Sequence, residues 1–519
     1  MPSTRFFGLR GDALNVATII GVLMPAILSV GYNATSLGGV LSLRSFEAQF
    51  REIGLDDASD KDHAAAIQGA VVAVYPIGGF LGTFICIWLG DFLGRRRTIM
   101  SGALVQIIGA VLNASAFCLA QLVASRLVSG LGTGMLLATV PLWQSEIAPA
   151  SKRGSHVATK GIFSGLGCAI TLFLEYGLSL RDGKMAWRFP AAFTAIFSLA
   201  VLGFIIFLPD SPRWLIQRGR ITEARDTLAA LEDLSPDDKE IDNRIEDMQA
   251  SFNRSGNQKT LAQLFTMGPQ RTSHRAFLAM TVMTFLQLTG ATVTQFYTTA
   301  IFENNLGLQE STSRLLAAVY QLMGPVGGIL CVLTIERLGR RALLMSSAAG
   351  NAICLALIAA LGSMNGNPMA AHGAVFFIFL FHFSYIIGFG SIPYLYASEI
   401  APMNLRATIS SVSISISWAI SILVANVTPI AFNEMGQRYF FFFAGFNIFM
   451  IPAVFYFFPE TSGRTLEEID EIFTCARGLF DAVSIAKKLP PRVRLEILTP
   501  EKGMLVKEKS LDSPLESPI

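Results

Sequence analysis

The sequence predicts an all-α membrane protein with twelve transmembrane helices in two pseudo-symmetric six-helix bundles. Three observations support this fold class. Of the 519 residues, 52% are hydrophobic and only 15% are charged, whereas about 25% of an ordinary soluble domain is charged. Apolar stretches of about 20 residues, the length of helix that crosses a bilayer, recur along the chain. Three charged motifs also occur twice, in the same order.

The repeated motifs divide the chain into two equivalent halves. In the first half they are the segments 90–97 (GDFLGRRR), 145–149 (SEIAP) and 208–211 (LPDS). In the second half they are the segments 335–341 (IERLGRR), 398–402 (SEIAP) and 458–461 (FPET). The three motifs keep the same order and nearly the same spacing in both halves, which indicates a duplication. Duplicated membrane halves are a known way of building transporters.

Each half contains six expected spans. Those of the first half are 14–38, 64–89, 98–119, 121–143, 157–178 and 189–208. Those of the second half are 276–302, 314–335, 342–362, 374–396, 407–432 and 440–458. The resulting parts are an N-terminal bundle (1–208), a helical linker (209–273), a C-terminal bundle (274–458) and a tail (459–519).

Short helices are expected outside the spans. Ser211 followed by proline is a good helix start, Gly219 a plausible stop, and residues 222–234 have the pattern of a short amphipathic helix. Thr465 and Glu468 form a capping box that opens another helix. Beyond about residue 489 the sequence is rich in proline and lysine, which predicts disorder.

The basic residues predict the orientation. Arginines and lysines that follow spans 2, 4, 8 and 10 all fall on the side of the two termini, which the positive-inside rule makes cytoplasmic. The loop after the first span is acidic and is expected on the other side. A formal net charge of +2 gives no reason to expect nucleic acid as a partner. The chain has no Cys-x-x-Cys pair, Walker loop or nucleophile–base pair, so we expect no metal, cofactor or enzymatic activity.

The ordered motifs resemble those of the sugar porter family of the major facilitator superfamily. Besides the repeats, the segments 209–213 (PDSPR) and 287–290 (QLTG) are similar to that family. The resemblance implies the major facilitator fold, a small-molecule cargo and a cycle in which two bundles rock about a central site within the lipid bilayer. It also implies a multi-pass protein of the plasma membrane with both termini in the cytoplasm, and a monomer is expected.

A network of charges at the cytoplasmic face is expected to control gating. The resemblance implies ion pairs between the bundles that hold the inside closed, although the arginines alone could also serve only to fix topology. The expected gating residues are Asp91, Arg95, Arg96, Glu146, Arg153, Asp210, Glu336, Arg340, Arg341, Glu399, Arg406 and Glu460. Exposed pairs are each worth about 0–1 kcal/mol, so several together could bias a two-state equilibrium without locking it.

The expected cargo site departs from the family pattern. The resemblance assigns cargo binding to Gln287, Thr292, Gln295, Phe296, Tyr297, Ser391, Tyr394, Ser417 and Trp418. Several amide side chains that the family carries are missing here, and two polar family positions fall at Gly161 and Gly324. Either hydroxyl groups rebuild the polar site, or the cargo is bulkier and less hydroxylated than a hexose. The two glycines would then leave room for cargo, unless they only let helices approach closely.

The mode of coupling depends on Asn33 and Arg126. Proton-coupled relatives carry aspartate where this chain has Asn33, facing an arginine that Arg126 retains. Because asparagine cannot titrate, the resemblance favours facilitated diffusion. Arg126 could then contact Asn33 and backbone carbonyls, face water, or bind an anionic group of the cargo. Lys160 is expected to reach the membrane interface, or to neutralise a carboxylate on the cargo. His382 is a less favoured alternative proton carrier, because histidine changes charge near neutral pH.

The leading hypothesis is therefore a carrier for a hexose or sugar-like polyol, working by alternating access. The alternatives are a carrier of a non-sugar small organic molecule, such as a specialised metabolite or organic acid, and a proton symporter. A non-transporting sensor is disfavoured because the tail is short. Without an ATP-binding motif, transport is expected to run on gradients.

Overall fold

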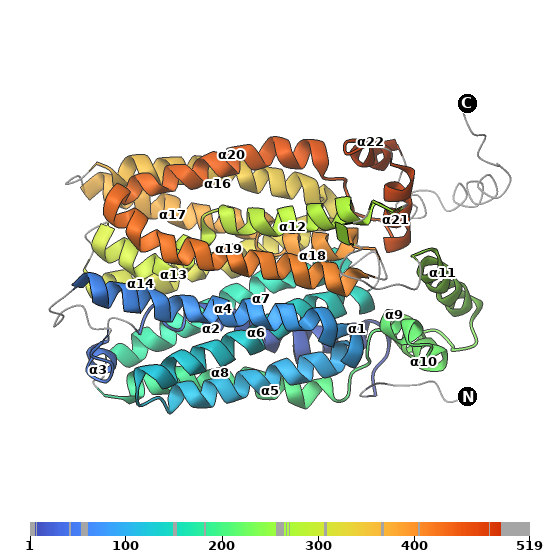
Figure 1. The fold of residues 1–519 in the computed structure, drawn as a ribbon, viewed down its shortest axis with the longest axis horizontal. Helices are drawn as coiled ribbons and strands as arrows, with labels where there is room; N and C mark the ends of the chain where they lie inside the picture. Colours follow the sequence, from blue (N-terminus) through green and yellow to red (C-terminus); the bar gives the residue numbers. More distant parts are fainter. Residues whose placement is uncertain are drawn as a thin grey trace.

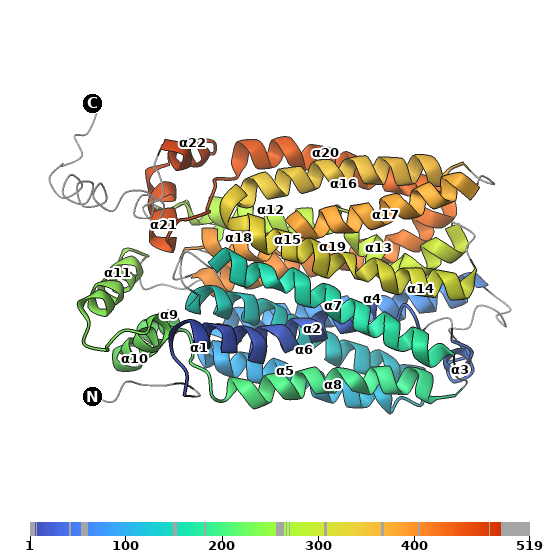
Figure 2. The same ribbon diagram turned by 180° about the vertical axis from the view of Figure 1, so that it is seen from behind.

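A computed structural model shows two bundles of long helices packed side by side (Figures 1 and 2). It describes residues 6, 8–40, 43–52, 61–148, 153–180, 183–255, 264–265, 267–268, 270–305, 309–364, 368–402, 405–476 and 478–488. Twelve of the described helices are long and apolar enough to cross a membrane. The twelve predicted spans are thus confirmed in number and place, with ends that shift by a few residues.

The first six spans form the N-terminal bundle. The first span consists of α1 (Gly11–Thr18), a π-helical turn (Ile19–Leu23) and α2 (Met24–Thr35). The next five are α4 (Lys61–Leu93), α5 (Arg95–Ala114), α6 (Leu119–Ile147), α7 (Arg153–Ser179) and α8 (Met185–Ile205). Small residues allow close packing here, since a Cβ on Gly78 would lie 2.3 Å from the carbonyl oxygen of Leu127.

The last six spans form the C-terminal bundle. They are α12 (Thr272–Leu288) with α13 (Ala291–Ala300) and a π-helical turn (Ile301–Asn305), α14 (Glu310–Gln321) with α15 (Met323–Leu338), α16 (Arg340–Gly362), α17 (Pro368–Gly388) with α18 (Ile392–Ile400), α19 (Arg406–Met435), and α20 (Tyr439–Phe457) after a 3₁₀ turn (Gly436–Arg438). Three of these spans are interrupted. Gly290, with φ of +92°, separates α12 from α13. Pro393, at the start of α18, cannot donate a hydrogen bond to the preceding turn, which ends α17.

Short helices gather at one end of the molecule, which we call the terminal end (Figure 1). They are α9 (Pro212–Gln217), α10 (Ile221–Glu232), α11 (Lys239–Ser255), α21 (Leu466–Cys475) and α22 (Asp481–Lys488). The helix α3 (Arg44–Glu47) lies at the opposite end. The predicted starts are confirmed: the amide of Trp214 donates to Ser211 at 3.3 Å, and Thr465 and Glu468 form the capping box. The predicted tail beyond residue 489 lies outside the described residues.

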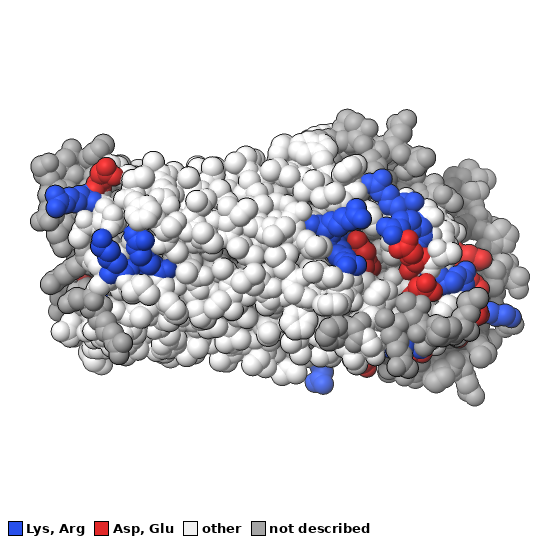
Figure 3. All heavy atoms as spheres, turned by 90° about the horizontal axis from the view of Figure 1, so that it is seen from below, with Lys and Arg blue, Asp and Glu red and all other residues white. Residues whose placement is uncertain are grey.

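The surface between the two ends is apolar. Large side chains such as Leu333, Phe376 and Ile448 are more than half exposed there. Figure 3 shows charged side chains at both ends of one face and an uncharged band between them. Water would not solvate such a band favourably, but the hydrocarbon core of a bilayer would, so the bundles are built to sit in lipid.

Candidate functional site

In the N-terminal bundle, a charged cluster closes the terminal end. Gly94, with φ of +86°, lets the chain turn directly from α4 into α5. A single oxygen of Asp210 accepts hydrogen bonds from the backbone amides of Arg95 and Arg96 at 3.2 and 3.3 Å, which caps α5. The guanidinium of Arg95 forms a buried bidentate ion pair with the carboxylate of Glu146 of α6, with N–O distances of 3.0 and 3.1 Å.

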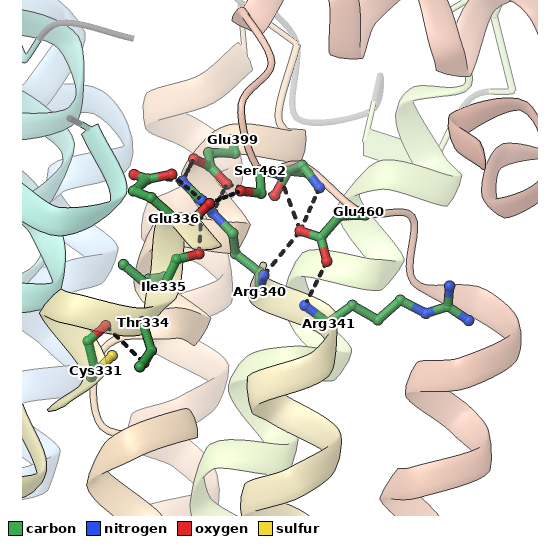
Figure 4. Close-up of polar contacts among 10 residues, drawn as sticks. Cys331, Thr334, Ile335, Glu336, Arg340, Arg341, Glu399, Glu460 and Ser462 are labelled. Carbon is green, nitrogen blue, oxygen red and sulfur yellow. Dashed lines mark hydrogen bonds and ion pairs between the residues drawn. The ribbon is translucent and has the colours of Figure 1, made fainter. Parts of the chain in front are cut away.

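The C-terminal bundle repeats this cluster (Figure 4). Gly339 has φ of +87°, and both oxygens of Glu460 accept from the first amides of α16, those of Arg340 at 2.9 Å and Arg341 at 3.1 Å. The guanidinium of Arg340 donates to Glu399 at 2.9 Å and to Glu336 at 2.7 Å. One buried arginine therefore holds two carboxylates in place.

The remaining predicted gating residues bind backbone or lie outside the described part. Arg96 and Arg341 donate to the carbonyls of Ile206 and Phe455. Arg406 is buried and donates to the carbonyls of Ser398 at 2.9 Å and Ala401 at 3.3 Å. The side chains of Asp91 and Arg153 lie outside the described residues.

The predicted ion pairs between the bundles stay a prediction, because the side chain of Arg153 lies outside the described residues. The short arginine–glutamate pairs that the structure describes here join helices of one bundle, since both partners belong to the same six spans. Across the bundles, Glu146 and Arg406 interact electrostatically.

Hydroxyl groups and a lysine connect the two bundles. The hydroxyls of Thr83 and Ser415 lie 2.8 Å apart, and Ser391 donates to the carbonyl of Ala158 at 3.1 Å. Ser391, predicted to contact cargo, is thus part of this contact. Lys160 of α7 is buried, contrary to the expectation that it reaches the membrane interface. Its ammonium group lies 3.7 Å from the ring centre of Tyr394 and donates to the carbonyl of Gly390 at 3.2 Å.

Gly161 and Gly324 serve close packing in this structure. A Cβ on Gly324 would lie 2.8 Å from the Cα of Gly165 in the other bundle, and a Cβ on Gly161 would lie 2.9 Å from the hydroxyl of Ser391. The sequence offered two interpretations of these glycines, extra room for cargo or close helix packing, and in this structure neither glycine provides extra room. Both let α7 approach the C-terminal bundle.

A polar group with an aromatic wall forms the candidate cargo site. The amide of Gln287 donates to Ser417 at 2.8 Å and accepts from Thr292, which brings α12, α13 and α19 together. Trp418 lies between the bundles, since its ring meets Tyr75 edge-on at 6.0 Å and packs on Gly79. Within the described part of the chain, the buried indole N–H of Trp418 has no hydrogen-bond partner.

The other predicted cargo residues lie nearby on α13. Gln295, Phe296 and Tyr297 are half-buried. The hydroxyl of Tyr297 donates to the carbonyl of Ala425 at 2.9 Å, and its backbone is not helical, which marks a kink. The structure thus joins Gln287, Thr292 and Ser417 by hydrogen bonds, whereas Ser391 contacts Ala158 and Tyr394 contacts Lys160, both on α7.

The predicted contact between Asn33 and Arg126 is wrong. The amide nitrogen of Asn33 donates to the carbonyl of Ser29 at 3.0 Å. Arg126 donates instead to Ser36 at 3.2 Å, and its guanidinium lies 4.9 Å from the ring centre of Tyr75. Ser36 lies almost one helical turn after Asn33, so Arg126 binds the end of the same helix but not the predicted residue.

Sequence reasoning missed one buried acid. Glu175 lies in α7, where it is 3% exposed, and Arg126 acts on it electrostatically. An acidic residue inside an apolar span is a recognised signal of function that could have revealed it. His382, by contrast, is buried with its ring centre 4.4 Å from that of Tyr320, and neither ring nitrogen has a hydrogen-bond partner. This environment fits packing better than proton transfer.

Among the residues that the structure describes, no group of three or more His, Cys, Asp or Glu side chains could hold a metal ion. The twelve spans and the two repeated clusters instead define a secondary transporter with the major facilitator fold. A solved structure shares this fold: that of the proton:xylose symporter XylE bound to 6-bromo-6-deoxy-D-glucose, with a TM-score of 0.80 at 19% identity over 89% of this chain and 100% of that chain.

The sequence comparisons identify the family. The profile of the family described as "Sugar (and other) transporter" matches residues 18–473. The chain is 33% identical over 478 residues to the sugar transporter STL1 of Saccharomyces cerevisiae, covering 91% of this chain and 84% of that protein. It is 30% identical to the MFS-type transporter oryC of Aspergillus oryzae, covering 94% of this chain and 91% of that protein. The chain therefore belongs to the sugar porter family, whose members are multi-pass membrane transporters rather than enzymes.

Proposed function

We propose that this protein carries a hexose or a sugar-like polyol across the membrane by alternating access. The supporting observation is the polar group of Gln287, Thr292 and Ser417 beside Trp418. It combines amide and hydroxyl groups, which bind sugar hydroxyls, with an aromatic face, which packs on C–H groups. Because Trp418 contacts the N-terminal bundle, cargo held there would lie between the two moving bodies.

The missing family amides set the expected size of the cargo. A ligand with a millimolar Kd is held by about 4 kcal/mol, and one net hydrogen bond contributes about 0.5–1.5 kcal/mol. The three polar side chains and the free indole N–H of Trp418 supply enough hydrogen bonds for a small cargo. A small polyol fits this set at least as well as a hexose.

The sidedness of the protein is part of the proposal. The terminal end carries the arginine clusters, so the positive-inside rule makes this end cytoplasmic and the opposite end extracellular in the plasma membrane. Cysteine accessibility tests this assignment. In a variant without the exposed Cys118 and Cys475, a cysteine in place of Glu434 should react with an impermeant reagent in intact cells. A cysteine in place of Arg97 should react only after the cells are permeabilised.

Uptake of labelled hexoses and polyols into cells that lack their own carriers tests the cargo. We expect saturable uptake of at least one member of the panel, weakened by Gln287→Ala by about 2- to 12-fold in KM, the equivalent of one hydrogen bond. Gln121→Ala is the control. Gln121 lies near the start of α6, away from the candidate cargo site, and hydrogen-bonds to Ser115, so this substitution should leave KM unchanged. Wild-type cells that take up no sugar or polyol, but secrete or import another organic molecule, would favour the non-sugar alternative.

A further inference from the structure

Glu175 is a buried carboxyl group of α7. It is 3% exposed, and among the residues that the structure describes neither of its oxygens has a hydrogen-bond partner. One oxygen lies against the backbone just after α2, because a Cβ added to Gly39 would sit only 2.2 Å from it. Glycine at this position therefore leaves the space that the carboxyl group occupies.

Arginines of both bundles interact electrostatically with this carboxyl group. Arg126 of α6 and Arg314 of α14 act on Glu175 electrostatically, and Tyr32 of α2 is the neighbouring phenol. Arg126 keeps its Nε without a partner while it binds Ser36. Since α14 belongs to the C-terminal bundle, Glu175 lies where the two bundles meet, in the half of the membrane away from the terminal end.

Burial at a moving interface makes the charge of Glu175 depend on conformation. An ionised carboxylate that lacks hydrogen bonds is costly in an apolar interior, and protonation removes the cost. When the bundles separate at this end, water can reach the group and stabilise the ionised form. A group whose protonated form favours one conformation must, by linkage, couple proton binding to the conformational change.

We propose that Glu175 is the proton-binding group of this transporter and makes it a proton symporter, in place of the titratable group that Asn33 cannot provide. In the outward-open form the carboxylate takes a proton from the extracellular solution, forming an O–H bond. The neutral carboxyl group then allows closure with cargo bound. After the bundles open to the cytoplasm, the O–H bond breaks and the proton passes to water that enters between the bundles from the cytoplasmic side, so one proton enters with each cargo molecule. The ionised carboxylate then favours the return to the outward-open form. This inference rests on the proposed function and replaces facilitated diffusion.

Two other buried titratable side chains of the spans have different surroundings. Lys160 contacts Tyr394 and the carbonyl of Gly390, and His382 packs on Tyr320. Of these three groups, Glu175 is the one that interacts electrostatically with arginines of both bundles. Its environment is therefore expected to change when the bundles rock.

Purified full-length protein in liposomes provides the test. The cargo is a labelled sugar or polyol that shows counterflow, which is exchange without a net driving force. With the outside one pH unit more acidic, a symporter of one proton per cargo can accumulate cargo up to about tenfold, and a facilitative carrier cannot accumulate it. Glu175→Gln should retain counterflow and lose accumulation, and Glu175→Asp should restore part of it.

The matched control is Glu434→Gln, which removes an exposed carboxylate at the same end of the protein. It should accumulate cargo as the wild type does. Accumulation by Glu175→Gln equal to that of the wild type would overturn the proposal, as would wild-type counterflow without accumulation at any pH gradient.

A measurement without cargo keeps the two proposals distinguishable. Dicyclohexylcarbodiimide reacts with protonated carboxyl groups in apolar surroundings, and mass spectrometry can locate the adduct. We expect labelling of Glu175 that falls as the pH rises from about 5 to about 9, a range in which surface glutamates are already ionised. Labelling without counterflow of any sugar or polyol would sink the proposed cargo and support the role of Glu175. Labelling that does not change with pH would overturn that role.

Discussion

The two bundles are nearly identical at the terminal end and differ in the opposite half. At the terminal end, a positive-φ glycine, a capped helix start and a buried arginine–glutamate pair occur in both. A nearby hydrogen bond also occurs in both bundles: Trp143 donates to the carbonyl of Pro209 at 3.2 Å, and Tyr396 donates to the carbonyl of Pro459 at 3.0 Å. The duplication has kept this end of each bundle almost unchanged.

The opposite half shows what the duplication has not kept. Glu146 and Glu399 lie 253 positions apart. The same offset places Phe379 opposite Arg126, and Thr428 opposite Glu175. The C-terminal bundle thus carries uncharged side chains at the positions that correspond to Arg126 and Glu175. The contrast teaches that the shared parts serve the moving scaffold, whereas cargo and coupling depend on residues that only one half carries.

The largest effect is expected from breaking the shared clusters. Arg340→Leu would remove the ion pairs of Arg340 with Glu336 and Glu399, and Arg95→Leu would remove the ion pair of Arg95 with Glu146. Breaking one buried pair costs about 3–5 kcal/mol. Both variants should lose most of their folded, monodisperse protein in size-exclusion chromatography of detergent extracts. A loss in only one of the two would show that the clusters are not equivalent.

The two glycines should show the next largest effect. Gly339→Ala and Gly94→Ala place a Cβ 2.5 and 2.8 Å from the capping carboxylates Glu460 and Asp210, at a φ that disfavours alanine. Such strain costs about 1–3 kcal/mol, so both variants should unfold at a lower temperature. Gly445→Ala, in a helix with nothing within 4 Å of the new Cβ, is the control. Unchanged melting in both variants would mean that the turn is not under this constraint.

Trp418→Phe tests the candidate cargo site, which lies between the two ends of the molecule. This substitution keeps an aromatic ring but removes the unpaired indole N–H. If that group donates to cargo, KM should rise by about 2- to 12-fold while the melting temperature hardly changes. Trp88→Phe, at a half-exposed site on the lipid-facing surface, should have no effect on KM.

The smallest effect concerns the length of the capping side chain. Glu460 uses both oxygens on the two arginine amides, whereas Asp210 uses one oxygen on both. Glu460→Asp should lose about one hydrogen bond, or 0.5–1.5 kcal/mol, and Asp210→Glu should change stability less. Equal effects of the two exchanges on the melting temperature would show that the second oxygen of Glu460 contributes nothing.

The sequence was a good guide where local patterns decide the structure. Span positions follow from apolar length, and the capping box at Thr465 and Glu468 follows from local hydrogen bonding, so both were predicted correctly. The motif arginines were also placed at the correct end of the bundles.

Partner choice could not be predicted, because it depends on how helices pack. Periodicity does not reveal that Arg126 reaches Ser36 rather than Asn33, nor that Lys160 turns inward onto Tyr394. Glu175 was visible in the sequence as a charge in an apolar span, but its neighbours Gly39 and Arg314 come from distant parts of the chain.

Asp210 and Glu460 each follow the last span of a bundle and bind the start of its third span. These described capping bonds each join residues of one half of the chain. A chain cut between α11 and α12 would leave two fragments that each keep one set of these bonds. We therefore expect that the carrier can be produced as two separate polypeptides that reassemble in the membrane.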